Sequence, residues 1–215
     1  MAARERILAE IRRRQGRGGP LSPAERETVE TYLRRHPRGP LRNPAADLVA
    51  EFRKRAEAAA STTDRVASIS EAPAAIARYL VAHKLPQSGC VWPVLANLDW
   101  RSAGLALEPR AAQGDDAIGV TGVFCAIAET GTLMLCAGRD TPATVSLLPE
   151  THIAIVPAGR IVAYMEDGWD LARAELGQLP RAVNFISGPS RTADIEQTIV
   201  LGAHGPYRVH ILIVD

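Results

Sequence analysis

The run VHILIV, residues 209–214, is apolar at every position except His210. A strand that faces water on one side alternates apolar and polar residues, whereas a strand covered on both faces has no such alternation. The run is therefore typical of a strand in the middle of a largely parallel sheet. The sequence predicts an α/β fold with an open, mostly parallel sheet flanked by helices.

Short apolar runs alternate with amphipathic segments upstream of this strand, from about Ser61 onward. We predict one α/β domain over residues 61–215 from this alternation. Strands are expected at RVASI, GCVWPVL, THIAIVPAGRIV and RAVNFIS, and helices at APAAIARYLVAHKL and AYMEDGWDLARAEL. The runs VTGVFCAIAE and TLMLCAG flank Thr130 and Gly131.

The first sixty residues have a different character. Apolar residues recur at helical spacing in segments 4–14, 23–35 and 45–60, and GRGGP and HPRGPLRNP separate these segments. Residues 1–55 hold 14 basic and 7 acidic side chains, whereas the rest of the chain is net acidic. We predict a basic helical arm and linker over residues 1–60, which docks on a partner or on the acidic body. Few aromatic residues and no recognisable nucleic-acid motif argue against nucleic acid as that partner.

Several classes of protein do not fit the composition. No stretch reaches about 18 uninterrupted apolar residues, and the first residues are charged where a signal peptide is apolar, so we expect a cytoplasmic protein that does not cross a membrane. Cys90, Cys125 and Cys136 form no CxxC pair, and we expect them to be buried as small apolar residues. With no phosphate-binding glycine motif either, we expect no metal, cluster or dinucleotide in this chain.

The first polar cluster is Glu129-Thr130-Gly131-Thr132, between two apolar runs. One interpretation is a β-hairpin turn in which Gly131 supplies a positive φ and the threonines are strand formers. The other is a functional site. Glu129 closes the run GVFCAIA, where a carboxylate taken out of water needs partners or a raised pKa.

The second polar cluster is SGPSRTADIE, residues 187–196. Gly188 and Pro189 end a strand, and the following backbone N–H groups, two hydroxyls and Arg191 suit a small carboxylate or phosphate. Asp194 and Glu196 are expected in the first turn of a helix. The alternative is a helix start, with Ser190 or Thr192 as the cap and Arg191 paired with Asp194. We favour the small-anion site, because capping needs fewer polar groups.

Three long segments carry a resemblance to a known family. GVTGVFCAIAETGTLML, THIAIVPAGRIV and ISGPSRTADIEQTIVLGAHGP resemble the lactate utilization protein C family, which has a LUD domain, and RERILAEIRRR and DLVAEFRKRAEA are also similar to it. The resemblance implies a fold like that of the NagB/RpiA/CoA transferase group. It also implies a part in bacterial oxidation of L-lactate to pyruvate, alongside a cysteine-rich partner and an iron–sulfur partner that would hold the clusters.

Three functions remain open on this basis. The chain is a component of a lactate-oxidising system that binds a small anion, a non-catalytic assembly or regulatory subunit that docks an iron–sulfur partner, or a stand-alone isomerase or cyclo-ligase on the same fold. Whether the chain itself is an enzyme stays open. The candidate catalytic residues are Glu129 and Asp194, and the candidate ligand-binding residues are Thr130, Gly131, Thr132, Gly188, Ser190, Arg191, Thr192, Glu196 and His204.

Overall fold

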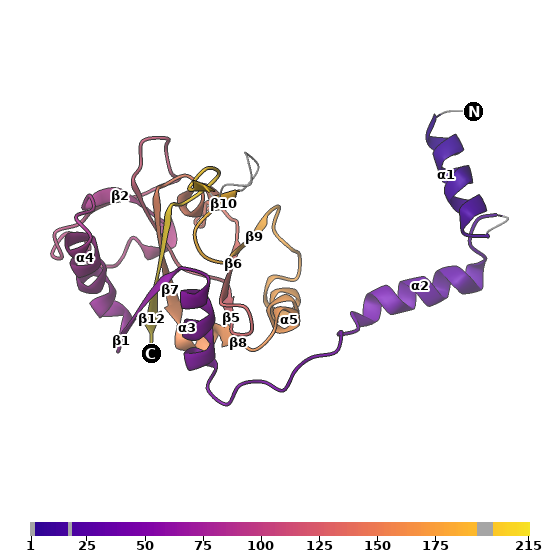
Figure 1. Ribbon diagram of the computed structural model, residues 1–215, viewed down its shortest axis with the longest axis horizontal. Helices are drawn as coiled ribbons and strands as arrows, with labels where there is room; N and C mark the ends of the chain where they lie inside the picture. The colour runs from indigo at the N-terminus through magenta and orange to yellow at the C-terminus, as the bar shows by residue number, and fades with distance from the viewer. Residues whose placement is uncertain (1–2, 17–18, 193–199) are drawn as a thin grey trace. The chain divides into compact units, whose positions relative to one another are not determined.

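The computed structural model describes residues 3–16, 19–192 and 200–215. The chain divides into two compact units between Arg42 and Asn43 (Figure 1). Within the described parts of the chain, no helix is long and apolar enough to cross a membrane.

The first unit contains the helices α1 (Ala3–Arg14) and α2 (Pro23–Arg35). Ser22 caps α2 through a capping box with Glu25, and local ion pairs such as that between Glu10 and Arg14 follow the helix surface. No described residue of either helix is buried. The side chains therefore support these helices through local contacts rather than through a core.

The second unit is built on a six-stranded parallel sheet in the order β1-β12-β7-β4-β2-β3. Its strands are β1 (Thr62–Val66), β2 (Ser88–Val91), β3 (Ala106–Pro109), β4 (Ile118–Thr121), β7 (Thr151–Pro157) and β12 (Arg208–Val214). The strand β12 lies between β1 and β7, and it is buried from Val209 to Val214. The prediction of a central parallel strand at VHILIV is confirmed.

Alternate residues of β12 enter two separate cores, one on each face of the main sheet. Val209, Ile211 and Ile213 pack with residues of α3 (Leu48–Ala58) and of a second sheet. Leu212 and Val214 pack with residues of α4 (Ala72–Ala82) on the other face. The main sheet is thus covered on both sides, as its continuous apolar strands require.

The second sheet has the order β8-β5-β6-β9 and is partly antiparallel. Its strands are β8 (Ile161–Val162), β5 (Cys125–Ile127), β6 (Thr132–Cys136) and β9 (Val183–Ile186). The helix α5 (Met165–Leu176) packs on it through Ala172, which contacts Cys125 and Met134. Figure 1 shows α4 and α5 on opposite sides of this unit with the strands between them.

Three differences between the sequence prediction and the structure concern how the elements of this unit connect and pack. The predicted strand over residues 151–162 is interrupted by a 3-10 turn at Ala158–Arg160, which separates β7 from β8 and directs the chain to the second sheet. The short edge strand β3 was missed, because ALEP carries a proline and a glutamate instead of an apolar run. The helix α3 was assigned to the arm, but burial of Phe52 and Ala56 places it in the second unit.

The three cysteines are all free in the structure. Cys90 and Cys125 are buried, as predicted, and Cys136 is partly buried. Burial raises the pKa of the Cys90 thiol to about 12 and that of Cys125 to about 11, so neither thiol is ionised near neutral pH.

Candidate functional site at the amino edge of the main sheet

The first polar cluster forms the turn between β5 and β6. Gly131 has a φ of +67°, and its N–H donates to the Ile127 carbonyl at 2.9 Å, as the hairpin interpretation predicted. A Cβ at Gly131 would lie 2.3 Å from the Ala56 nitrogen. The turn therefore packs directly against the backbone of α3, and glycine is needed for both the conformation and the contact.

The hydroxyl groups of this turn connect to the second cluster. Thr130 Oγ1 donates to Thr132 Oγ1 at 2.7 Å, and Thr132 Oγ1 lies 2.6 Å from Ser187 Oγ. Thr132 is buried, and the neighbouring residues of β6 and β9 are paired. The two clusters therefore meet in the fold, and the Thr132 and Ser187 hydroxyls are already hydrogen-bonded to each other.

Glu129 lies in solvent and not in the apolar environment that the sequence suggested. Its Oε1 accepts a hydrogen bond of 3.5 Å from the N–H of Met165, the first residue of α5. A carboxylate at this end of a helix is stabilised by the helix dipole. The position of Glu129 thus matches a role at the start of α5.

Gly188 and Arg191 contact the end of α3. Gly188 has a φ of +77°, and a Cβ there would lie 2.0 Å from the Ala59 carbonyl oxygen. Arg191 Nη2 donates to the same oxygen at 3.2 Å. Since the last carbonyls of a helix lack partners within the helix, an arginine at this point satisfies one of them.

The described part of the segment after Gly188 forms a short ladder, and the helix expected to begin near Asp194 lies outside the described residues. Arg191–Thr192 is the strand β10, which pairs in antiparallel fashion with β11 (Val200–Leu201). Asp194 and Glu196, the remaining candidates of this cluster, lie outside the described residues.

Ser190 joins this segment to LGAHGP. Its N–H donates to the Pro206 carbonyl at 2.9 Å, and its carbonyl accepts from the Gly202 N–H at 2.9 Å. A Cβ at Gly205 would lie 3.3 Å from Ser190 Cβ. The side chain of His204, between these glycines, is exposed. The structure thus brings together the two motifs of the sequence prediction.

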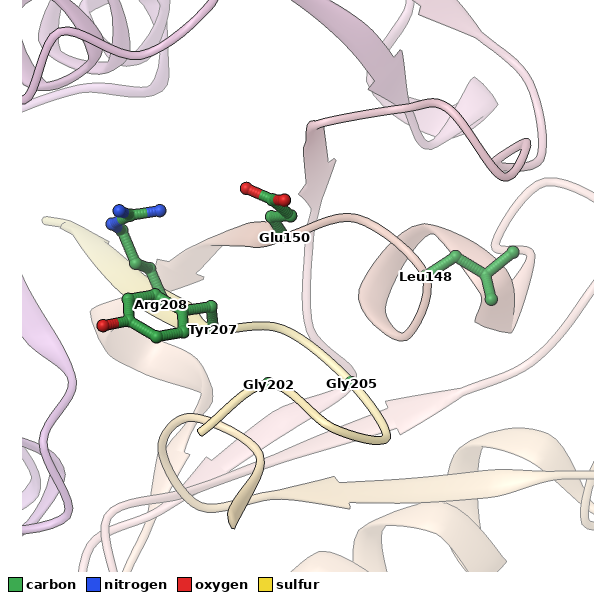
Figure 2. Close-up of a pocket in the computed structure, with 6 residues that line it drawn as sticks. All are labelled: Leu148, Glu150, Gly202, Gly205, Tyr207 and Arg208. Atoms are coloured by element: carbon green, nitrogen blue, oxygen red, sulfur yellow. The ribbon is translucent and has the colours of Figure 1, made fainter. Parts of the chain in front are cut away.

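A hollow of about 410 Å³ opens beside these segments at the amino ends of β7 and β12 (Figure 2). The backbones of the two strands are joined here, because the Arg208 N–H donates to the Glu150 carbonyl at 3.0 Å. The hollow is lined by Leu148, Glu150, Gly202, Gly205, Tyr207 and Arg208.

Arg208 and Glu150 are the charged side chains of this hollow. The Arg208 guanidinium lies over the Tyr207 ring, 4.8 Å from its centroid. Over residues 3–16, 19–192 and 200–215, neither charged side chain makes a hydrogen bond or an ion pair. Sequence reasoning missed both residues because it searched for dense polar clusters. Their signal is a charged residue at the start of each of two strongly apolar runs, THIAIV and VHILIV.

Two histidines lie in the sheet close to the hollow but are buried. His152 Nε2 is 2.8 Å from Thr121 Oγ1, and His210 Nδ1 is 2.8 Å from Thr62 Oγ1. Burial lowers the pKa of His152 to about 3 and that of His210 to about 4. Both side chains are therefore neutral at physiological pH and belong to the core. Among the residues that the structure describes, no group of three metal-ligating side chains gathers.

The sequence model of the LUD domain matches residues 49–214, which is most of this chain. The chain belongs to the LUD domain family. Lactate utilization protein C of Bacillus subtilis is 37% identical over 133 residues, which cover 56% of this chain and 55% of the relative. The protein of the same name from Bacillus licheniformis is 36% identical over 141 residues, covering 63% and 55%. This LUD chain thus matches about half the length of those relatives.

A solved structure supports the same assignment. The crystal structure of a DUF162 family protein from Deinococcus radiodurans superposes with a TM-score of 0.60 at 26% identity. The superposition covers 82% of this chain and 100% of the other. The α/β fold predicted from the sequence is therefore also that of a solved relative.

Proposed function

We propose that this LUD protein is a component of a bacterial lactate-utilization system and that the hollow at the starts of β7 and β12 binds a small carboxylate. The names of its relatives support the first part of the proposal. The second part rests on the geometry of the hollow. The segment LGAHGP, which contains the candidate residue His204, provides Gly202 and Gly205 as its walls.

The guanidinium of Arg208 is the observation that carries the proposal. Its planar fork of N–H donors suits a carboxylate, and it is uncommitted to any described side-chain acceptor. Tyr207 holds the guanidinium from one face, and the paired strands β7 and β12 fix the backbone beneath it. A rigid base of this kind lowers the entropic cost of binding.

Electron transfer in such a system belongs, in this proposal, to the cysteine-rich and iron–sulfur partners. Cys90, Cys125 and Cys136 lie on separate strands, and the first two are un-ionised near neutral pH. The contribution of this chain is then to bind and orient the acid through Arg208.

Calorimetric titration of the full chain with L-lactate tests the binding site. Because a hydrogen bond to a charged group contributes about 1.5–3 kcal/mol, Arg208→Gln should weaken binding by about tenfold to a hundredfold. Arg78→Gln is the matched control, since Arg78 is exposed on α4, away from the hollow-lining residues. Equal weakening by both variants, or no binding by the wild type, would refute the assignment.

Growth of the host bacterium tests the cellular role. A strain that lacks the gene should fail to grow on L-lactate as the sole carbon source but should grow on pyruvate. The wild-type gene should restore growth on L-lactate, and the Arg208→Gln gene should restore it poorly. Normal growth of the deletion strain on L-lactate would contradict the proposed role.

A second candidate function, assembly with an iron–sulfur partner, is favoured by the first unit. The side chains of Ile7, Tyr32 and Leu33 are each 60% exposed or more. With 11 arginines against 5 glutamates over residues 1–42, this unit combines apolar and basic contacts. If assembly is its role, removal of residues 1–42 should abolish co-purification of an iron–sulfur protein while lactate binding persists. Retained co-purification would argue against this function.

A further inference from the structure

We infer that the hollow recognises two neighbouring groups of its ligand, a carboxylate through Arg208 and a hydrogen-bond donor on the adjacent carbon through Glu150. The inference rests on the proposed function and specifies its ligand class. It assigns to the hollow a small acid with a hydroxyl or ammonium group at carbon 2, in preference to a 2-oxo acid or an unsubstituted acid.

Arg208 and Glu150 lie at the starts of two neighbouring strands. Arg208 begins β12 and Glu150 directly precedes β7, and these strands are neighbours in the main sheet. Figure 2 shows the guanidinium and the carboxylate rising on the same side of the backbone, above the loop that carries Gly202 and Gly205. Parallel strands lie about 4.8 Å apart. Arg208 is paired with Thr151, the residue after Glu150, so the two charged residues lie one position apart on neighbouring strands, where they can reach two neighbouring groups of one small molecule.

Other arginines near strand ends form ion pairs, whereas Arg208 forms none with any residue that the structure describes. Arg65 is 2.7 Å from Asp215, Arg110 is 2.6 Å from Asp116, and Arg160 is 2.7 Å from Glu175. Arg208 and Glu150 lie beside each other along the sheet edge without forming such a pair. Their opposite charges are therefore both available to a ligand.

Glu150 offers the ligand a hydrogen-bond acceptor. The side chain is exposed and lines the hollow, and its carboxylate oxygens accept hydrogen bonds. A hydroxyl or ammonium group of the ligand can donate to it. A 2-oxo group would place one acceptor against another, and an unsubstituted acid would offer nothing at this position. One hydrogen bond to a charged group corresponds to a preference of about tenfold.

Calorimetric titration of the full chain with four acids tests the inference. We expect L-lactate to bind about tenfold more tightly than pyruvate and propionate. L-alanine is the fourth ligand, because it has an ammonium group where lactate has a hydroxyl. Binding of L-alanine above propionate would also support donor recognition, and the tighter of lactate and alanine identifies the donor. Equal binding of all four acids would overturn the inference.

Two variants separate this inference from the proposed function. In Glu150→Gln the amide donates as well as accepts, so pyruvate should bind nearly as well as L-lactate. Asp115→Asn is the control at an exposed loop residue and should keep the wild-type preference. A preference for lactate that survives in Glu150→Gln would overturn the inference alone, provided that Arg208→Gln still weakens every acid. Failure of the wild type to bind any acid would instead remove the proposed function.

Discussion

Two sets of residues lie near the amino edge of the main sheet and differ in what they contact. The α3 contact set, Gly131, Thr132, Ser187, Gly188 and Arg191, either packs against the end of α3 or hydrogen-bonds within the protein. The side chains of the hollow pair, Arg208 and Glu150, make no hydrogen bond or ion pair with the described residues. A dense polar motif can thus join parts of the fold, whereas isolated charges beside it remain available for binding.

Substitution of a glycine in the α3 contact set should have the largest effect on stability. Gly131→Ala would force a side chain into a left-handed conformation and against the Ala56 backbone. Strain and overpacking together should lower the free energy of unfolding by about 2–6 kcal/mol. Gly159→Ala is the control, because nothing lies within 4 Å of its Cβ position. Denaturant unfolding of both variants measures the difference, and equal stabilities would show that the turn does not need its contact with α3.

A substitution in the core of α3 should have the next largest effect on the free energy of unfolding. Phe52 is fully buried, so Phe52→Ala should lower the free energy of unfolding by about 3–5 kcal/mol. Ile11 of the first unit is 45% exposed, and Ile11→Ala should change it by less than about 0.5 kcal/mol. Removal of residues 1–42 should likewise leave the cooperative unfolding of the second unit intact. A strongly destabilised Ile11→Ala protein would show that the first unit shares the core.

The pH dependence of stability tests the burial of His152 and His210 beside the hollow. The pKa of His152 is about 3 and that of His210 about 4 in the folded protein, against about 6.5 for an unfolded histidine. Because the unfolded chain then binds more protons, stability is full above pH 6.5 and falls as the pH is lowered. Between pH 6.5 and 5 we expect a loss of about 2–4 kcal/mol.

Urea unfolding at four pH values across that window measures the loss. Replacement of His210 by glutamine should reduce the slope by about half, since one histidine then no longer titrates. A free energy of unfolding that stays constant from pH 6.5 to 5 would contradict the burial of the two rings.

Much of the fold could be predicted because its signals are local. The apolar run of β12, in which His210 is the exception, indicated a central parallel strand, and Thr130-Gly131 indicated the hairpin between β5 and β6. The separation into two sheets depends on a turn of three residues after β7, which periodicity does not register. The burial of Phe52 depends on contacts with distant strands, so its helix looked like a continuation of the basic arm.

The candidate site was less predictable for a related reason. The sequence shows where polar groups are dense, but not which of them are already hydrogen-bonded. Arg191 stood in the denser motif, yet it reaches the carbonyl of Ala59. Arg208 was overlooked because β12 was considered only as a core strand, although its first side chain lies at the surface hollow.

The most direct test of this account compares Arg208→Gln with Arg191→Gln, each measured for L-lactate affinity by calorimetry and for thermal stability. We predict that Arg208→Gln weakens binding by about tenfold or more and leaves the melting temperature unchanged. Arg191→Gln should bind normally and lose about 0.5–1.5 kcal/mol of stability. The opposite result, with affinity lost in Arg191→Gln and retained in Arg208→Gln, would place the anion site in the α3 contact set and contradict the account.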